Sequence, residues 1–297
     1  MSDSQPEGPA PVLMMAHAHP DDEASQTGGT LARYAAAGWR TVLITCTDGG
    51  QGDGPDGEKP GHPHHDPQQV AALRSRELDL AAAALGVHDL VKLGYPDSGM
   101  PNGTATPPPA DAFSRRPITP MVTRLVELLR RYQPDVIVTY PSNGLSGHPD
   151  HIRTHQLVHA ALHNVAADAV DGPGDRDSAT RKVTKLYYIA MSKTRLRAVR
   201  AGARAAFGEN VWVPPEEMAV DDSDITTVID IATYWDNKIR ALSAHASQSD
   251  AAAVVQMLCA GANLADFCER VEEYIRADDA GSGRTGFVED GFAGDGP

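Results

Sequence analysis

Short strand-like segments alternate with helix-like segments through the first half of this chain, and this order limits the folds open to it. Apolar runs of strand length lie at 12–17, 41–47, 89–95 and 135–140. Helical patterns follow them at 22–38, 68–85, 118–132 and from about residue 151 onward. Because a strand–helix–strand unit joins parallel strands, we predict an α/β, Rossmann-like three-layer fold with a mostly parallel sheet.

The pattern loosens beyond residue 168, where we expect a C-terminal elaboration of the same domain. The expected elements there are strands within 182–191 and 225–231 and helices within 233–248 and 264–277. A chain of 297 residues suits one large domain. We therefore predict a disordered lead-in at 1–10, a single domain at 11–277 and a disordered acidic tail at 278–297.

The composition disfavours several classes of protein. The net charge is −14, with 40 acidic against 26 basic residues, and this sign disfavours nucleic acid and anionic membranes as partners. No apolar run approaches the ~18 residues of a membrane span, and the N-terminus does not have the pattern of a signal peptide. The three cysteines are too few and too scattered for a disulfide framework, so we expect a cytoplasmic protein. The oligomeric state stays open, a homo-oligomer included.

The most reactive side chains follow two of the predicted strands. The motif "AHAHPDDE" (16–23) follows the first strand, and "GHPDH" (147–151) follows the fourth. Ligands of open α/β sheets bind at the carboxyl ends of the strands, so we expect both motifs to serve one site. A hydrolytic zinc site needs about three His or carboxylate ligands, an open position for water and a base near that water.

These two motifs contain such a set of residues. His19 and Asp22 can supply two ligands from one turn, and His151 can supply a third from the other loop. Asp21 is next to a ligand and is the candidate base. The plainer alternatives are that Asp22 caps the following helix and that Asp21 is a solvated carboxylate.

The remaining polar residues of the motifs have candidate supporting roles. His148 could act as a general acid or stabilise an oxyanion, and Asp150 could hydrogen-bond a ring nitrogen of His148. His17 lies two residues before His19 and shares its face of the sheet. Since His17 is deeper in the strand, we expect it to pack behind the site.

Other polar features have plainer interpretations. His155, His159 and His163 recur every four residues on one helix stripe, where we expect them to be partly packed, with His155 the nearest to the site. Glu23 either orients a ligand histidine or caps the helix that follows. The "TGGT" at 27–30 has neither the lysine nor the glycine spacing of a phosphate-binding loop.

The motifs "AHPDDE" and "GHPDH", with "DSGM" (97–100) between them, resemble the signature motifs of the LmbE/PIG-L-like zinc-dependent N-deacetylase family. That family includes the deacetylase and the S-conjugate amidase of mycothiol metabolism, and the resemblance covers about residues 12–163. It implies that His19, Asp22 and His151 bind Zn²⁺ and that Asp21 activates water.

The same resemblance implies further roles. His148 would assist the tetrahedral intermediate and the leaving amine, with Asp150 as its partner. Arg74 and Asp97 match positions that contact the sugar or inositol part of the substrate, although Arg76 lies only two residues beyond Arg74. A site of two histidines and one carboxylate also suits Fe²⁺.

One position departs from the family pattern. Ser146 stands where the mycothiol-pathway members carry a tyrosine that polarises the amide carbonyl. Loss of one oxyanion donor costs roughly 3–4 kcal/mol of barrier in other enzymes, so Ser146, as a substrate-binding residue, would affect rate or substrate identity. Gln26 matches neither the deacetylase nor the amidase branch.

We therefore predict a metal-dependent hydrolase that removes an N-acyl group from an N-acetylglucosamine-type small molecule, with a glucosaminyl-inositol as one candidate substrate. The alternatives are a mycothiol S-conjugate amidase and a family member that binds metal or sugar with little turnover. A phosphoesterase ranks below these, because paired metals with more bridging carboxylates would be expected for it.

Overall fold

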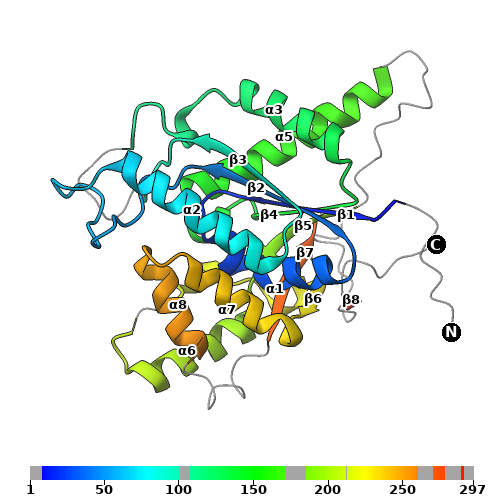
Figure 1. Ribbon diagram of the computed structural model, residues 1–297. Coiled ribbons are helices and arrows are strands. Elements are labelled where there is room, and N and C mark those ends of the chain that lie inside the picture. Colours follow the sequence, from blue (N-terminus) through cyan, green and yellow to red (C-terminus); the bar gives the residue numbers. More distant parts are fainter. Residues whose placement is uncertain are drawn as a thin grey trace.

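A single mixed sheet organises the molecule, and helices cover both of its faces (Figure 1). The computed structural model describes residues 9–100, 108–171, 185–211, 213–259, 270–277 and 289–290. Most of the predicted lead-in and of the predicted tail lies outside these residues. Two residues of that tail, Glu289–Asp290, form a short strand beside the rest of the sheet.

The sheet has the strand order β3-β2-β1-β4-β5-β7-β6-β8. Its strands are β1 (Val12–His17), β2 (Arg40–Thr47), β3 (Asp89–Tyr95), β4 (Val136–Thr139), β5 (Lys185–Ala190), β6 (Thr227–Asp230), β7 (Val271–Arg276) and β8 (Glu289–Asp290). Strands β1 to β5 pair with one another in parallel, whereas β7 pairs antiparallel with both β5 and β6. The prediction of a mostly parallel α/β sheet is confirmed.

Helices α3 and α5 cover one face of the sheet, and α1, α2 and α7 cover the other (Figure 1). The helices are α1 (Asp22–Ala36), α2 (Pro67–Leu85), α3 (Ile118–Tyr132), α4 (Gly144–Gly147), α5 (Pro149–Asp171), α6 (Lys193–Phe207), α7 (Trp235–Ala244) and α8 (Ser249–Cys259). Short 3₁₀ turns lie at Phe113–Arg115, Glu216–Met218, Asp222–Asp224 and Ala232–Tyr234. None of the described helices is long and apolar enough to cross a membrane.

The central strand β1 explains why the sheet is covered on both sides. All six of its residues are buried. Leu13 and Met15 pack with the helices on one face, and Met14 packs with those on the other, because successive side chains of a strand point to opposite faces. A strand buried on both faces has a continuous apolar run in place of an alternation.

The helix that follows the long loop after β2 shows how local signals set its ends. Asp66 caps α2 by accepting from the backbone N–H of Gln68 at 2.9 Å, and Pro67 occupies the first turn. Gly86 ends the helix in the left-handed conformation, with φ 70°. The predicted stop at this glycine is confirmed.

The prediction of a helix over 264–277 is wrong where the structure describes that segment. Val271–Arg276 form strand β7, and residues 264–269 lie outside the described part. Glutamate and arginine favour helices locally, but Glu272 and Tyr274 alternate with more exposed neighbours and are buried against α1. Pairing with β5 and β6 therefore decides the conformation.

The "TGGT" segment has a packing role. Gly29 lies in α1, and a Cβ atom there would come within 2.5 Å of the side chain of Ile231. Gly29 thus lets α1 approach the segment after β6 closely. Helices α6 and α8 are additions that the sequence did not predict.

Candidate active site

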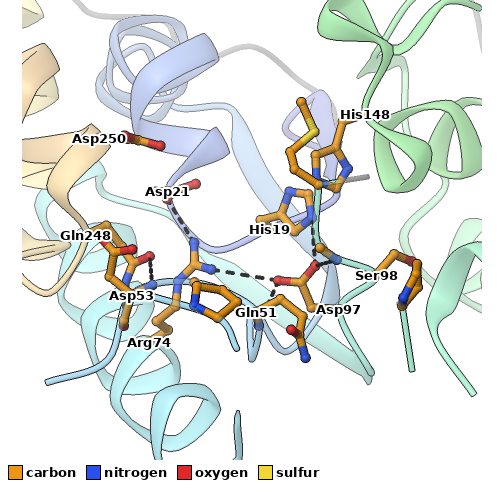
Figure 2. Close-up of a pocket in the computed structure, with 15 residues that line it drawn as sticks. His19, Asp21, Gln51, Asp53, Arg74, Asp97, Ser98, His148, Gln248 and Asp250 are labelled. Atoms are coloured by element: carbon orange, nitrogen blue, oxygen red, sulfur yellow. Dashed lines mark hydrogen bonds and ion pairs between the residues drawn. The ribbon is translucent and has the colours of Figure 1, made fainter. Parts of the chain in front are cut away.

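A cavity of about 330 Å³ lies where the carboxyl ends of β1, β2, β3 and β4 meet. Figure 2 shows Asp21 and Arg74 between two groups of residues, with His19 and His148 on one side and Gln248 and Asp250 on the other. The lining residues include His19, Asp21, Gln51, Asp53, Arg74, Asp97, Ser98, His148, Gln248 and Asp250. Both motifs thus reach one site, as strand-end placement predicts.

The three predicted metal ligands converge on one point. Oδ2 of Asp22 lies 3.2 Å from Nδ1 of His19 and 3.4 Å from Nε2 of His151. The two imidazole nitrogens are 3.3 Å apart. Ligand atoms bound at about 2.0–2.1 Å to a tetrahedral zinc ion are separated by about 3.3–3.4 Å. The spacing and the chemistry of this donor set fit a metal ion.

A looser grouping of possible ligands surrounds the same histidine. Ligand atoms of His19, Asp97, His148 and Asp150 lie within 4.8 Å of one another, and so do those of His19, His148 and His151. The carboxylates of Asp97 and Asp150 are engaged by backbone N–H groups. We therefore assign the tighter set of His19, Asp22 and His151 as the better candidate for the metal.

Each of the three candidate ligands is oriented by a second contact. His151 uses Nδ1 to reach the carbonyl oxygen of Gly144 at 3.1 Å. Nε2 of His19 lies 3.2 Å from the carboxylate of Asp150. Contacts of this kind set the tautomer and direction of metal-binding imidazoles. The contact between Asp150 and His19 thereby fixes the first turn of α5 relative to the end of β1.

Tyr140 orients the third ligand, and sequence analysis missed it. Its hydroxyl donates to Oδ2 of Asp22 at 2.7 Å and accepts from the backbone N–H of Ala18 at 3.0 Å. Its ring is fully buried and stacks on His151 with centroids 4.1 Å apart. The available signal was its position directly after β4, at the edge of the sheet that carries the motifs.

Asp21 has an unfavourable backbone conformation. It precedes α1 with φ 101° and ψ −27°, and left-handed geometry costs a non-glycine residue about 1–3 kcal/mol. Nη2 of Arg74 donates to its carboxylate at 2.8 Å. Burial raises the pKa of Asp21 to about 6, against the lowering effect of Arg74.

Arg74 is part of the wall of the cavity. Nη2 also donates to the carbonyl oxygen of Pro20, and Nη1 donates to that of Gly49 at 2.8 Å. A Cβ atom on Gly49 would lie 2.6 Å from Nη1, so a glycine is needed for this approach. Arg74 is buried and bridges Asp21 to Asp97, whose carboxylate is 4.0 Å from Nη1.

Asp97 is fixed mainly by backbone groups. It accepts from the N–H of Gly99 at 2.9 Å and from that of Gln51 at 3.2 Å. Burial raises its pKa, but the charge and hydrogen bond of His19, the charge of Arg74 and the hydrogen bond from Gly99 outweigh burial, so the pKa lies well below the usual range. An ionised carboxylate therefore faces the cavity.

Asp150 does not reach His148 with its side chain. Its carboxylate lies against His19 and accepts from both the backbone N–H and the hydroxyl of Ser98. Only its backbone N–H reaches His148, at Nδ1, over 3.1 Å. The predicted side-chain contact is absent because His148 is extended, ahead of α5, whereas Asp150 lies in the first turn of α5, so the two side chains point in different directions.

His148 lines the cavity with its ring edge-on to His19, with centroids 4.5 Å apart. Burial, helped by the nearby histidines, lowers the pKa of His148 to about 2. A neutral imidazole whose Nδ1 accepts a hydrogen bond carries its proton on Nε2. His148 can therefore donate from Nε2.

Several predicted residues lie away from the cavity lining. Ser146 is exposed on α4 and does not line the cavity. His155 contacts the carbonyl oxygen of Tyr140, and His159 contacts the hydroxyl of Tyr188. His17 contacts Thr27 at 2.9 Å behind the site, the kind of environment expected for a packing role.

A segment directly after α7 completes the cavity, and sequence analysis did not assign it to the site. Gln248 and Asp250 line the cavity, and Ser249 donates to Asp53 on the opposite loop. His245 is fully buried and contacts Glu23. The only sequence signal was the segment "KIRALSAHASQ" (238–248), a weak family-like feature.

Comparison with known proteins identifies the family. A model described as "PIG-L: GlcNAc-PI de-N-acetylase" matches residues 14–162. The chain belongs to the PIG-L family. Its candidate ligands and base all fall within the matched residues.

Relatives with curated names agree with this assignment. A 1D-myo-inositol 2-acetamido-2-deoxy-alpha-D-glucopyranoside deacetylase of Rhodococcus erythropolis is 38% identical over 242 residues, which is 80% of each chain. A protein of the same name from Thermobifida fusca is 37% identical and covers 80% of this chain and 82% of its own. PIG-L deacetylases are metal-dependent hydrolases of amide bonds.

Solved structures share the fold at low identity. The N,N'-diacetylchitobiose deacetylase of Pyrococcus horikoshii has a TM-score of 0.57 and 18% identity, covering 94% of this chain and 88% of its own. The 4-carboxy-2-hydroxymuconate hydratase GalB of Pseudomonas putida has a TM-score of 0.58 and 16% identity, covering 95% and 99%. Because a deacetylase and a hydratase both match, this likeness shows the fold alone.

Proposed function

We propose that this protein is a metal-dependent deacetylase that hydrolyses the acetamido group of an N-acetylglucosaminyl inositol. The observation that carries the proposal is the convergence of His19, Asp22 and His151 at ligand spacing, next to a partly buried Asp21 that opens on the cavity. The names of the relatives support the inositol-linked sugar as substrate.

Two imidazoles and one carboxylate favour zinc, and Fe²⁺ is the alternative. A bound zinc ion supplies a Lewis acid and lowers the pKa of a water molecule to about 7. His19 and His151 would bind as neutral imidazoles whose second nitrogens are held by Asp150 and by Gly144.

Asp21 acts as the general base in this proposal. With its pKa raised to about 6, the carboxylate is ionised at neutral pH yet basic enough to take a proton from water. Arg74 donates to Oδ2 of Asp21, and none of the described residues donates to Oδ1, so this second oxygen can face the reacting water. Asp21 then returns the proton to the amine that leaves.

His148 acts as the oxyanion donor. Its neutral ring carries a proton on Nε2, and this N–H can stabilise negative charge that develops on the carbonyl oxygen. This assignment favours electrophilic assistance over proton delivery by His148.

The cavity suits a small polyhydroxylated molecule. Asp97, Asp53 and Gln51 offer oxygen or amide groups that can hydrogen-bond hydroxyls, and Gln248 lies at the far end.

The small number of cysteines supports a cytoplasmic location for the reaction.

The test compares wild-type protein with Asp21→Asn. Both are assayed for bound metal and for amine release from inositol-linked N-acetylglucosamine, free N-acetylglucosamine and a mycothiol S-conjugate. We expect equal metal content and a 10²–10⁴-fold loss of amine release in Asp21→Asn, the usual range for a general base.

A matched control is Asp56→Asn, the same change at an exposed position of the loop after β2 that does not line the cavity. It should behave as wild type. Turnover of the S-conjugate alone would assign the amidase activity instead. Absence of amine release from every substrate by metal-loaded wild type would refute the proposal.

A further inference from the structure

We propose that His245, acting through Glu23, is a positioning residue that holds the general base Asp21 in its working orientation. This inference rests on the proposed function, because it concerns the residue that activates water there. It assigns a role in the reaction to a residue far outside the matched family segment of 14–162.

Asp21 needs an external restraint. Its φ of 101° lies in the left-handed region that non-glycine residues avoid. Its own side chain makes no capping hydrogen bond to α1. The conformation persists only where the surroundings enforce it, so the groups that hold Asp21 determine where its carboxylate points.

Two groups hold Asp21 from opposite ends. Arg74 donates to the carboxylate at 2.8 Å. Glu23 accepts from the backbone N–H of Asp21 through Oε2 at 3.0 Å. Glu23 is the second residue of α1, and its bond back to the residue before the helix resembles the arm of a capping box that the third residue normally supplies. Glu23 therefore fixes the backbone on which the base is carried.

Glu23 is in turn fixed by His245. Nε2 of His245 lies 2.6 Å from Oε1 of Glu23, so the two carboxylate oxygens of Glu23 serve different partners. Both side chains are fully buried. Nδ1 of His245 has no hydrogen-bond partner among the described residues. The contact with Glu23 is thus the polar interaction that orients this ring.

His245 itself is placed by the end of α7 and by the segment that follows. Its backbone N–H closes the helix on the carbonyl oxygen of Leu242 at 3.1 Å. Two residues later, Ser247 donates to Glu77 of α2 through both its backbone N–H and its hydroxyl, each at 2.8 Å. The C-terminal segment is therefore anchored to α2 independently of Glu23.

This second anchor supplies a control. Ser247→Ala loosens the same segment without touching the contact between His245 and Glu23. His245→Ala removes that contact, whereas His245→Gln keeps an N–H donor near the position of Nε2. A merely structural role predicts similar effects of His245→Ala and Ser247→Ala, and a positioning role predicts different ones.

The experiment measures kcat and KM for inositol-linked N-acetylglucosamine, with metal content checked in each variant. We expect His245→Ala to lower kcat by about 10–100-fold, the usual effect of losing a group that orients a catalytic residue. KM and metal content should stay near the wild-type values, and His245→Gln should recover most of kcat. Ser247→Ala removes the hydroxyl that accepts from Nε2 of the cavity-lining Gln248 at 2.6 Å, so it should change KM and leave kcat near the wild-type value.

A double-mutant cycle tests whether His245 acts through Asp21. In the Asp21→Asn background, His245→Ala should cause no further loss, because the base is already absent. Losses that multiply, or equal losses in His245→Ala and Ser247→Ala, would overturn the proposal.

A readout without turnover separates this inference from the proposed function. Hydrogen exchange of the Asp21 backbone N–H should be faster in His245→Ala than in wild type and unchanged in Ser247→Ala. Unchanged exchange in His245→Ala would overturn the positioning role. If wild type releases no amine but exchange is faster in His245→Ala than in wild type, the proposed deacetylase activity is refuted and the restraint on Asp21 is supported.

Discussion

Two buried clusters of charged side chains in this protein differ in how their charges are balanced. The anchor pair, Lys238 and Glu272, joins α7 to β7 with Nζ and Oε1 2.5 Å apart. Glu272 also accepts from the backbone N–H and the hydroxyl of Thr30 at 2.8 and 2.6 Å, and Lys238 donates to the carbonyl oxygen of Ser25 at 2.8 Å. One cation meets one anion, and backbone and hydroxyl groups supply further partners.

In the second cluster, the site cluster around His19, buried acidic side chains outnumber the cations that could neutralise them. Asp22, Asp97 and Asp150 are all buried within reach of His19. Arg74, a permanently charged cation, is bonded to the neighbouring Asp21. Three potential metal-ligand atoms, Nδ1 of His19, Oδ2 of Asp22 and Nε2 of His151, are in mutual contact. The two imidazole nitrogens can supply at most two protons for these three contacts. Such an arrangement suits a bound cation, whereas the anchor pair is complete within the protein.

The largest expected effect separates these clusters by stability. Lys238→Met leaves Glu272 buried without its cation, which costs about 3–5 kcal/mol of the free energy of unfolding. Urea denaturation followed by circular dichroism measures this. The control Lys59→Met removes an ion pair with Asp53 in which the lysine is 63% exposed, and this should cost at most about 1 kcal/mol.

Adding Glu272→Leu to Lys238→Met should recover part of the loss, since an apolar pair can replace a buried ion pair at little cost. Equal stability of Lys238→Met and wild type would mean that the anchor pair contributes nothing to folding.

The next effect concerns metal binding and sharpens the contrast. Zinc at about 100 times its Kd should raise the free energy of unfolding of wild type by about 2.7 kcal/mol, and a chelator should reverse this. Asp22→Asn should lose the shift, while Lys238→Met should keep it. A shift of the same size in Asp22→Asn would place the metal elsewhere.

A smaller effect is expected at the residue that orients a ligand. Tyr140→Phe removes the hydroxyl that donates to Asp22 and should weaken zinc affinity by about 10–100-fold. Isothermal titration calorimetry gives the affinity directly. Tyr188→Phe is the control, because its hydroxyl contacts His159 outside the cavity. Equal affinities in both variants would assign Tyr140 a packing role only.

The smallest effect is expected at Ser146. The sequence predicts a substrate contact there, but Ser146 is exposed and does not line the cavity. We therefore expect Ser146→Ala to change amine release by no more than about twofold, equivalent to ~0.4 kcal/mol. Steady-state assays decide between the two. A tenfold loss would show that α4 contributes to the site during turnover.

The sequence predicted the N-terminal half of the fold better than the C-terminal half. The strand at 12–17 and the helix at 118–132 match β1 and α3. They were predictable because apolar periodicity and the residues that end helices and strands are local properties of the sequence. The segment that forms β7 carries glutamates and an arginine, and its state depends on neighbours more than 40 residues away in sequence.

By itself, the sequence determined that two motifs rich in His and Asp follow parallel strands and therefore share one edge of the sheet. Only the tertiary structure decided which groups orient them. Tyr140 reaches Asp22 across 118 residues, and His245 reaches Glu23 across 222. The physical reason is that ligand identity is encoded in residue type and spacing, whereas orientation comes from contacts that exist only once distant segments pack together.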